Sequence, residues 1–334
     1  MAIRTSLKFD MRSPDFGPPT RDLYAAALDM AQFADEIGVS AINAMEHHGF
    51  ADSYLPTPFV LGGGFAARTK QCRITLGAVV LPLHDPVKIA EQIAVLDLMS
   101  GGRLDVIIGA GYVDAEFRMF NSSMKQRGKL LDEGIEIILR ALHGDRFEAG
   151  GREIFVRPLP VQQPEDILIV GGGVEASAKR AARFGLGFGP MQRGLFGLYD
   201  AECRRLGREP GRKFGPGGVG DVHLTHDPEA AWAAIMPHLK HAVGDYARIA
   251  EESGANSPFR GLLASEEALR SCGIFTVCTP EELLEKARTV DAIGSLTFMP
   301  LMGGMPPELG WQSLKLLAEV MPELQKIAPV PERD

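Results

Sequence analysis

A charged triplet, Glu46-His47-His48, directly follows a short apolar segment, residues 40–45. Active sites of α/β folds lie at the carboxyl ends of their strands, so this triplet is placed to face a central cavity. An imidazole there can act as a base or as a hydrogen-bond donor near neutral pH. We predict a functional role for the triplet, with a loop histidine of no role as the alternative. We predict no metal site, because no histidine or carboxylate recurs nearby at zinc-ligand spacing.

Two glycine-containing segments follow other apolar runs. The segment 108–112 (IGAGY) has small residues that leave room for a ligand beside the backbone, although a lone GxG is weak evidence. The segment 170–177 (VGGGVEAS) leads from a strand through three glycines into a helix start, where free N–H groups and the helix dipole favour an anion. Phosphate binding is therefore favoured there over a tight turn, and Ser177 can add a hydroxyl. The segment matches neither the P-loop nor GxGxxG.

Two further patterns are ambiguous. In the segment 76–86 (LGAVVLPLHDP), Gly77 and Ala78 lack bulk, so a planar ring can approach the backbone, but on pattern alone ordinary strand packing is the better interpretation. Methionines recur at every third residue from 299 to 305, beside Pro300, which fits either packing at a barrel rim or a substrate pocket. Met302 is accordingly a candidate for substrate contact, and Met191, Glu46 and His48 are further candidates.

The elements that position these residues alternate along the whole chain. Short apolar runs predict strands at 3–9, 40–45, 73–81, 104–108, 167–170, 186–189, 218–224 and 295–300, and helical periodicity separates them. Eight such units predict one α/β domain over residues 1–334, a single (β/α)₈ barrel, with a doubly wound sheet as the alternative. Two irregular stretches, at about 143–163 and 254–278, are predicted to be insertions or lids.

Composition narrows the function classes. The 334 residues are 45% hydrophobic and carry a net charge of −8, without the basic stripe that nucleic-acid binding needs. The N-terminus lacks the apolar core of a signal peptide, and the longest apolar stretch is too short for a membrane span. None of the four cysteines forms a CxxC pair, which favours reduced thiols. We therefore expect a cytoplasmic protein that binds neither nucleic acid nor membrane.

Taken in order, these segments resemble the luciferase-like monooxygenase family. The matching pieces are EHH at 46–48, LG…VVLPLHDPVKIAEQIAVLDLMSGGRLDVIIGAGY at 76–112, EF at 116–117, LLDEGIEIILRAL at 130–142, the triple glycine from 171 and TPEELLEKA at 279–287. The block from LPLHDP to SGGR is long and specific, and the resemblance spans nearly the whole chain.

The resemblance implies a (β/α)₈ barrel that binds reduced FMN at the strand ends and uses O₂ to oxygenate a small organic substrate. His47 matches the active-site histidine of the family. The residues implied in cofactor binding are Ala78, Val79, Ala110, Gly111, Tyr112, Gly171, Gly172, Gly173, Val174 and Ser177, with a non-prolyl cis peptide near Ala78. Luciferases carry an arginine in place of Ala110, which argues against light emission here.

The resemblance also leaves alternatives. A separate flavin reductase is expected to supply reduced flavin, and a homodimer is expected by analogy. A deazaflavin-dependent hydride-transfer enzyme is the second hypothesis, because the family contains both types. A non-catalytic partner subunit is the third, against which the retention of His47 and the triple glycine argues.

Overall fold

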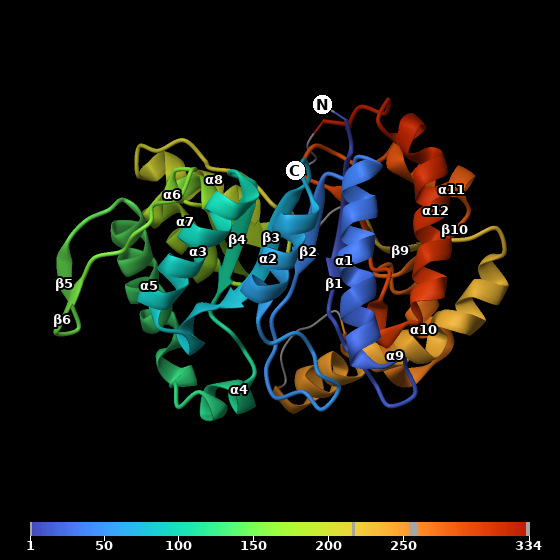
Figure 1. Ribbon diagram of the computed structural model, residues 1–334, viewed down its shortest axis with the longest axis horizontal. Coiled ribbons are helices and arrows are strands. Elements are labelled where there is room, and N and C mark those ends of the chain that lie inside the picture. The colour runs from blue at the N-terminus through green and yellow to red at the C-terminus, as the bar shows by residue number, and fades with distance from the viewer. Residues whose placement is uncertain (1, 216–217, 254–258, 332–334) are drawn as a thin grey trace. The chain divides into compact units, whose positions relative to one another are not determined.

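The computed structural model describes residues 2–215, 218–253 and 259–331 (Figure 1). The chain divides into two compact units, each built from several segments of the sequence. The first unit comprises Met1–Ile42, Phe50–Leu55 and Gly217–Arg333. The second comprises Asn43–Gly49 and Pro56–Pro216. Strand β2 (Ala41–Ala44) carries the chain from one unit to the other.

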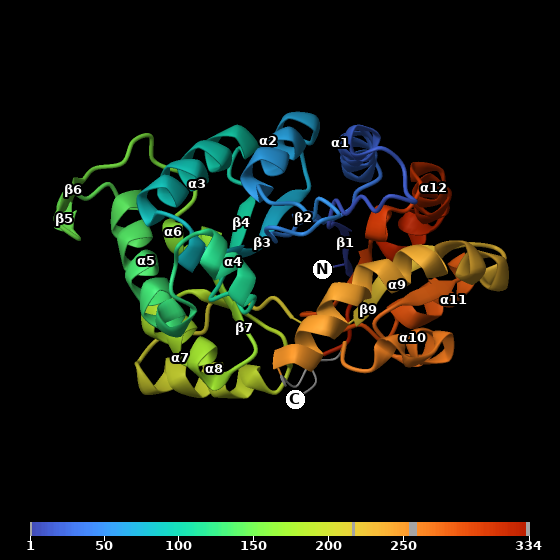
Figure 2. The same ribbon diagram turned by 90° about the horizontal axis from the view of Figure 1, so that it is seen from below.

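The first unit has parallel strands in the order β10-β9-β11-β1. The strands are β1 (Arg4–Phe9), β9 (Gly218–Leu224), β10 (Thr276–Cys278) and β11 (Ser295–Phe298). The helices are α1 (Thr20–Glu36), α9 (Pro228–Ser253), α10 (Glu266–Ser271), α11 (Pro280–Ala287) and α12 (Pro307–Leu324), with 3₁₀ turns η3 (Leu262–Ala264) and η4 (Met302–Gly304). Helices α1 and α12 lie side by side in both views (Figures 1 and 2).

Local sequence explains where these helices begin and what they bury. Thr279 and Glu282 form a capping box at the start of α11, in which each side chain binds the other residue's backbone N–H. In α1, Leu23, Ala27 and Met30 recur at the three- and four-residue spacing of one helix face, and all three are fully buried.

The second unit has parallel strands in the order β3-β4-β7-β8. They are β3 (Arg73–Val80), β4 (Leu104–Gly109), β7 (Leu168–Gly172) and β8 (Gly187–Pro190). The helices are α2 (Pro58–Arg68), α3 (Pro86–Ser100), α4 (Asp114–Met119), α5 (Arg127–Leu142), α6 (Pro164–Ile167), α7 (Glu175–Phe184) and α8 (Leu195–Arg205), with 3₁₀ turns η1 (Leu81–Leu83) and η2 (Met124–Gln126). Figure 2 shows α2, α3 and α5 following one another along one side of this unit.

Glycines allow close packing on one face of this second sheet. A Cβ on Gly77 would lie 3.0 Å from Ile107, and one on Gly171 would lie 2.9 Å from the same side chain. Glycine at both positions therefore lets the neighbouring strands β3 and β7 close on Ile107 of β4. Ala78, at the end of β3, is left exposed. Glycine or alanine therefore lies near the carboxyl end of β3, β4 and β7.

The observed elements agree with the predicted alternation of strands and helices, and the parallel strands confirm the α/β class. The stretch 143–163 holds an antiparallel hairpin of β5 (Phe147–Ala149) and β6 (Arg152–Ile154). Of the stretch 254–278, residues 254–258 lie outside the described part, and the remainder contains η3, α10 and the short strand β10.

Two short elements differ from the sequence prediction. Helix α4 precedes α5 as a separate segment of six residues, and β10 has three residues. Both are too short for hydrophobic periodicity to reveal. Among the helices described, none is long and apolar enough to cross a membrane.

Candidate functional site

His47 and Glu116 form a buried pair in the second unit. The Nδ1 atom of His47 lies 2.8 Å from Oε1 of Glu116, and the backbone N–H of His48 donates to the same oxygen at 3.0 Å. Glu116 is 1% exposed and His47 is 7% exposed. With Nδ1–H donating to the carboxylate, the imidazole presents the lone pair of Nε2 on its other side. The pair thus has the geometry of a histidine held in one tautomer by a carboxylate.

Glu116 is not among the site residues predicted from the sequence, although it lies in the EF pair of the family resemblance. Helix α4 brings Glu116 to the histidine from a position 69 residues further along the chain. Its second oxygen, Oε2, is buried and has no hydrogen-bond partner within the described part of the chain.

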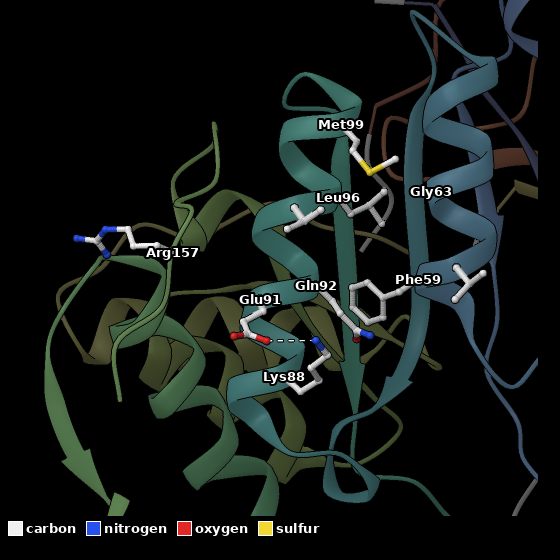
Figure 3. A pocket seen from close by; sticks show the side chains of 10 residues that line it. Phe59, Gly63, Lys88, Glu91, Gln92, Leu96, Met99 and Arg157 are labelled. Carbon is white, nitrogen blue, oxygen red and sulfur yellow. Dashed lines mark hydrogen bonds and ion pairs between the residues drawn. The ribbon is translucent and has the colours of Figure 1, made fainter. Parts of the chain in front are cut away.

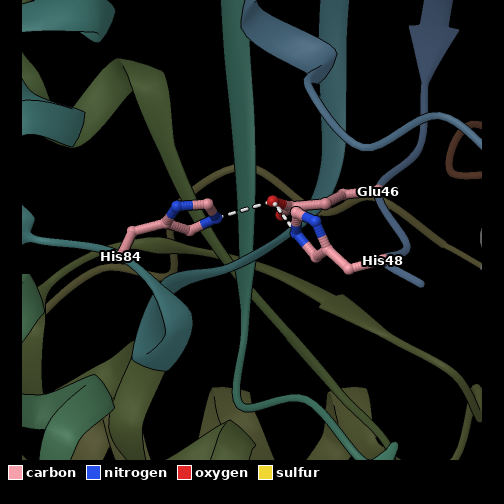
Figure 4. Close-up of side chains that lie close together, drawn as sticks. All are labelled: Glu46, His48 and His84. Carbon is pink, nitrogen blue, oxygen red and sulfur yellow. Dashed lines mark hydrogen bonds and ion pairs between the residues drawn. The ribbon is translucent and has the colours of Figure 1, made fainter. Parts of the chain in front are cut away.

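A second network surrounds Glu46 (Figure 4). The Oε1 atom of Glu46 lies 2.9 Å from Nε2 of His48 and 2.6 Å from Nε2 of His84, while Oε2 accepts from the backbone N–H of Val80 at 2.6 Å. Burial raises the pKa of Glu46, but the hydrogen bonds from His48 and His84 outweigh it and hold the pKa at about 2. Glu46 is therefore an ionised, buried carboxylate, and His84 is a second residue that the sequence analysis missed.

The end of β3 and the segment after β4, with Ala78 and Ala110–Tyr112, form a platform beside the His47–Glu116 pair. The Gly77–Ala78 peptide bond is cis, in the stretch where the resemblance implied one. Gly109 packs against Ala78, since a Cβ on Gly109 would lie 3.2 Å from the Cβ of Ala78. Ala110 is half-buried and Tyr112 is 47% exposed, whereas Val79 is fully buried and can offer a ligand only its backbone.

Tyr112 links the platform to the histidine. Its ring meets the ring of His47 edge-on, with centroids 5.9 Å apart. Gly111 has φ of +73°, and a Cβ there would lie 2.6 Å from Val80. Only glycine fits that turn, which directs Tyr112 toward His47.

The predicted phosphate segment joins β7 to α7. Gly172 has φ of +151°, and a Cβ there would lie 2.7 Å from the Cβ of Ser177. Val174 is the N-cap of α7 and makes no side-chain capping bond, so the positive end of the helix is open to an anion. The Ser177 hydroxyl donates to the carbonyl of Val174 at 2.5 Å. Ser177 thus shapes the turn, in addition to the ligand role predicted for it.

The structure places the remaining predicted residues as follows. Gly171 is buried inside β7 against Ile107, so its small size serves strand packing. Gly173 lies beside the exposed Met191, whose Cβ would be 3.5 Å from a Cβ on Gly173. Met302 belongs to the first unit, where it is 4% exposed. The substrate roles of Met191 and Met302 stay predictions.

Most of the chain matches the model of a known protein family. The profile described as "Luciferase-like monooxygenase" matches residues 9–296. The oxygenase component of a flavin-dependent trigonelline monooxygenase from Acinetobacter baylyi is 32% identical over 168 residues, which cover 48% of this chain and 47% of the relative. An N-acetyl-S-alkylcysteine monooxygenase from Bacillus subtilis is 30% identical over 232 residues, covering 68% and 63%. The matches thus span about half to two thirds of these relatives.

Solved structures share the fold at low sequence identity. The monooxygenase RslO1 from Streptomyces bottropensis superimposes with a TM-score of 0.73 at 23% identity over 96% of this chain and 99% of its own. The oxygenating constituent of 3,6-diketocamphane monooxygenase from Pseudomonas putida, in complex with FMN, gives 0.70 at 19% over 99% and 100%. An F420-dependent secondary alcohol dehydrogenase gives 0.67 at 14% over 97% and 99%. These likenesses confirm the predicted (β/α)₈-type α/β fold.

Proposed function

Because the chain belongs to the luciferase-like monooxygenase family, we propose that it is the oxygenase of a flavin-dependent monooxygenase that uses reduced FMN and O₂ to oxygenate a small organic substrate. The observation that carries this proposal is the buried His47–Glu116 pair beside a platform of small residues and an uncapped helix N-terminus. All three features lie in the second unit.

The residues present fit FMN. The backbone N–H groups at the start of α7, beside Gly172 and Gly173, would hold the phosphate, since no side-chain cap competes there. Ala78 and the segment Ala110–Tyr112 would hold the isoalloxazine ring, because small residues leave the backbone accessible there. When bound, reduced flavin would supply the two electrons that activate O₂, one atom of which would pass to the substrate.

His47 moves or holds a proton at Nε2. Glu116 is a positioning residue, because it contacts the ring at Nδ1 and fixes both the tautomer and the ring plane. The carboxylate also stabilises the imidazolium when Nε2 takes a proton. The hydrogen bond from the His48 backbone to the same oxygen keeps the carboxylate from rotating away.

A single turnover with isotopically labelled O₂ tests this proposal. Wild-type protein loaded with reduced FMN is expected to place one labelled oxygen atom in an organic product, found by screening a substrate panel. His47→Ala is expected to retain FMN binding and to lose at least about 100-fold in oxygen transfer, the usual contribution of a proton-transfer residue. Unchanged transfer by this variant would refute the role of His47.

The second candidate is hydride transfer with a deazaflavin cofactor, which the fold likeness to an F420-dependent dehydrogenase supports. Deazaflavin does not activate O₂. Reduction of a substrate by the deazaflavin-loaded protein, with no labelled oxygen in any product, would therefore favour this candidate. The FMN-bound structural neighbour and the flavin-dependent relative support the first candidate.

Two partners belong to the proposal. A separate flavin reductase supplies reduced FMN, as the name "oxygenase component" of one relative indicates for that protein.

The four free cysteines support a reducing, cytoplasmic location. A non-catalytic partner role is disfavoured by the His47–Glu116 pair, since a subunit without chemistry has no need of it.

The second partner is another copy of this chain. Helices α2 and α3 flank a surface pocket lined by Phe59, Gly63, Leu96 and Met99, among others (Figure 3). Val60 is 73% exposed and Met99 is 54% exposed on the same helices. Exposed apolar side chains beside glycines allow close helix packing, and a two-fold dimer needs one self-complementary surface. We therefore place the homodimer interface on the α2–α3 face.

A further inference from the structure

Three donor atoms converge beside the His47 loop. They are Oε1 of Glu46, Nε2 of His48 and Nε2 of His84, and all lie within 4.8 Å of one another (Figure 4). No other group of three or more His, Cys, Asp or Glu side chains in residues 2–215, 218–251 and 259–331 meets this spacing. We propose that these three residues bind one divalent transition-metal cation of the zinc type.

The chain brings the ligands together from two segments. Glu46 and His48 are two residues apart in the irregular segment that follows β2, and Nε2 of His48 meets the Glu46 carboxylate. His84 ends η1, just before α3, and its imidazole reaches back to the same carboxylate. The spacing of 36 residues between His48 and His84 hides the group from any search for local zinc motifs.

The donor set suits zinc. Two imidazoles and one carboxylate form a common three-ligand zinc site in proteins, and such a site leaves a further position for water. Hard cations such as Mg²⁺ prefer oxygen ligands and would be a poorer match to two nitrogen donors. Each imidazole binds through Nε2 and moves its proton to Nδ1, so no redox step is involved.

The separations need only a small adjustment. Ligand atoms about 2.1 Å from a tetrahedral zinc lie about 3.4 Å from each other. The Glu46 oxygen lies 2.9 Å from the His48 nitrogen and 2.6 Å from the His84 nitrogen. These two separations therefore need to open by less than about 1 Å, and the two histidine nitrogens, which lie within 4.8 Å of each other, need to reach the same spacing. His84 can supply this movement, because its side chain is 22% exposed and follows a short turn.

The surroundings hold the carboxylate in place for a cation. Oε2 of Glu46 accepts from the Val80 backbone at 2.6 Å, which leaves Oε1 directed at the two histidines. Such a hydrogen bond to the outer oxygen orients a metal-binding carboxylate. The ring of Phe120 packs on His48 at 4.5 Å between centroids and shields that side from water. A bound cation would join the His47 loop to the start of α3.

Metal binding to the full chain tests the site without any assay of activity. Protein stripped with a chelator is titrated with Co²⁺, followed by visible absorption, and with Zn²⁺, followed by equilibrium dialysis and elemental analysis. The proposal predicts one Zn²⁺ per chain and a Co²⁺ spectrum typical of nitrogen and oxygen ligands. His84→Asn and Glu46→Gln are expected to weaken Zn²⁺ binding at least tenfold.

His143→Asn is the matched control, because His143 also pairs with a glutamate, Glu165, at 2.8 Å but is exposed and, among the described residues, belongs to no group of three ligands. It should bind Zn²⁺ like the wild type. Because His84 is partly exposed, His84→Asn should fold and keeps the test valid even if Glu46→Gln does not fold. Absence of saturable Zn²⁺ binding by the wild type, or equal binding by His84→Asn, would overturn the proposal and leave the flavin chemistry untouched.

Discussion

Replacing Glu116 with glutamine removes the charge beside His47 and keeps the size of the side chain. The carbonyl oxygen of the new side chain can still accept from His47 Nδ1 and from the His48 backbone, which lie 2.8 Å and 3.0 Å from Oε1 of Glu116. The amide nitrogen replaces Oε2, which has no partner among the described residues. The variant therefore tests the charge of the pair with little change in its shape.

The expected magnitude follows from the hydrogen bond. A bond to an ionised partner contributes about 1 to 2 kcal/mol more than a bond between neutral groups. Since about 1.4 kcal/mol corresponds to a tenfold change in rate, oxygen transfer should fall about 5- to 30-fold. The affinity for reduced FMN should change less than about twofold, because Glu116 contacts the histidine and lies outside the platform and phosphate segments.

The assay is single-turnover transfer of labelled oxygen, run beside an anaerobic titration with reduced FMN. Glu165→Gln is the control, since the His143–Glu165 pair has the same 2.8 Å separation but is exposed, where such pairs contribute little. Glu116→Asp, which keeps the charge, should recover part of the rate. Wild-type transfer by Glu116→Gln, with unchanged FMN affinity, would refute the positioning role.

Three further predictions concern other parts of the chain. Gly172→Ala puts a Cβ 2.7 Å from Ser177 at φ of +151° and should weaken reduced FMN binding at least about tenfold in a fluorescence titration, whereas Gly173→Ala, with 3.5 Å of clearance, should stay within about twofold. Burial lowers the pKa of His223 to about 4, so the unfolded chain takes up a proton at this residue before the native state does. The free energy of unfolding should therefore fall by up to about 3 kcal/mol as pH falls from 6.5 to 4. Urea unfolding of His223→Gln at both pH values should show this pH-dependent loss removed. Met99→Lys should convert dimer to monomer in analytical ultracentrifugation, and an unchanged dimer would show that the interface does not lie on α2 and α3.

The sequence predicted the parts of the site that depend on local chain. The triplet at 46–48, the turn at 109–112 and the segment 171–174 follow apolar strands directly, so their place at strand ends can be inferred from order alone. The family resemblance added the cis peptide near Ala78, and the structure has it at Gly77–Ala78.

The partners of the histidines could not be inferred in this way. Glu116 and His84 reach the triplet from 69 and 38 residues along the chain, so only the packing of α4 and η1 decides the contacts. The contact of Ser177 with the Val174 carbonyl is local instead, since the two residues are three apart at the start of α7. Sequence spacing carries no record of the Glu116 and His84 contacts, because they depend on the angle at which each helix leaves its strand.

The central claim is that reduced FMN binds with its phosphate at the start of α7. Anaerobic equilibrium titration with reduced FMN, reduced riboflavin and reduced deazaflavin cofactor tests it most directly. The account predicts saturable binding of one FMN per chain, at least about tenfold tighter than riboflavin, which lacks the phosphate. Equal affinity for riboflavin, or binding of the deazaflavin in preference to FMN, would contradict it.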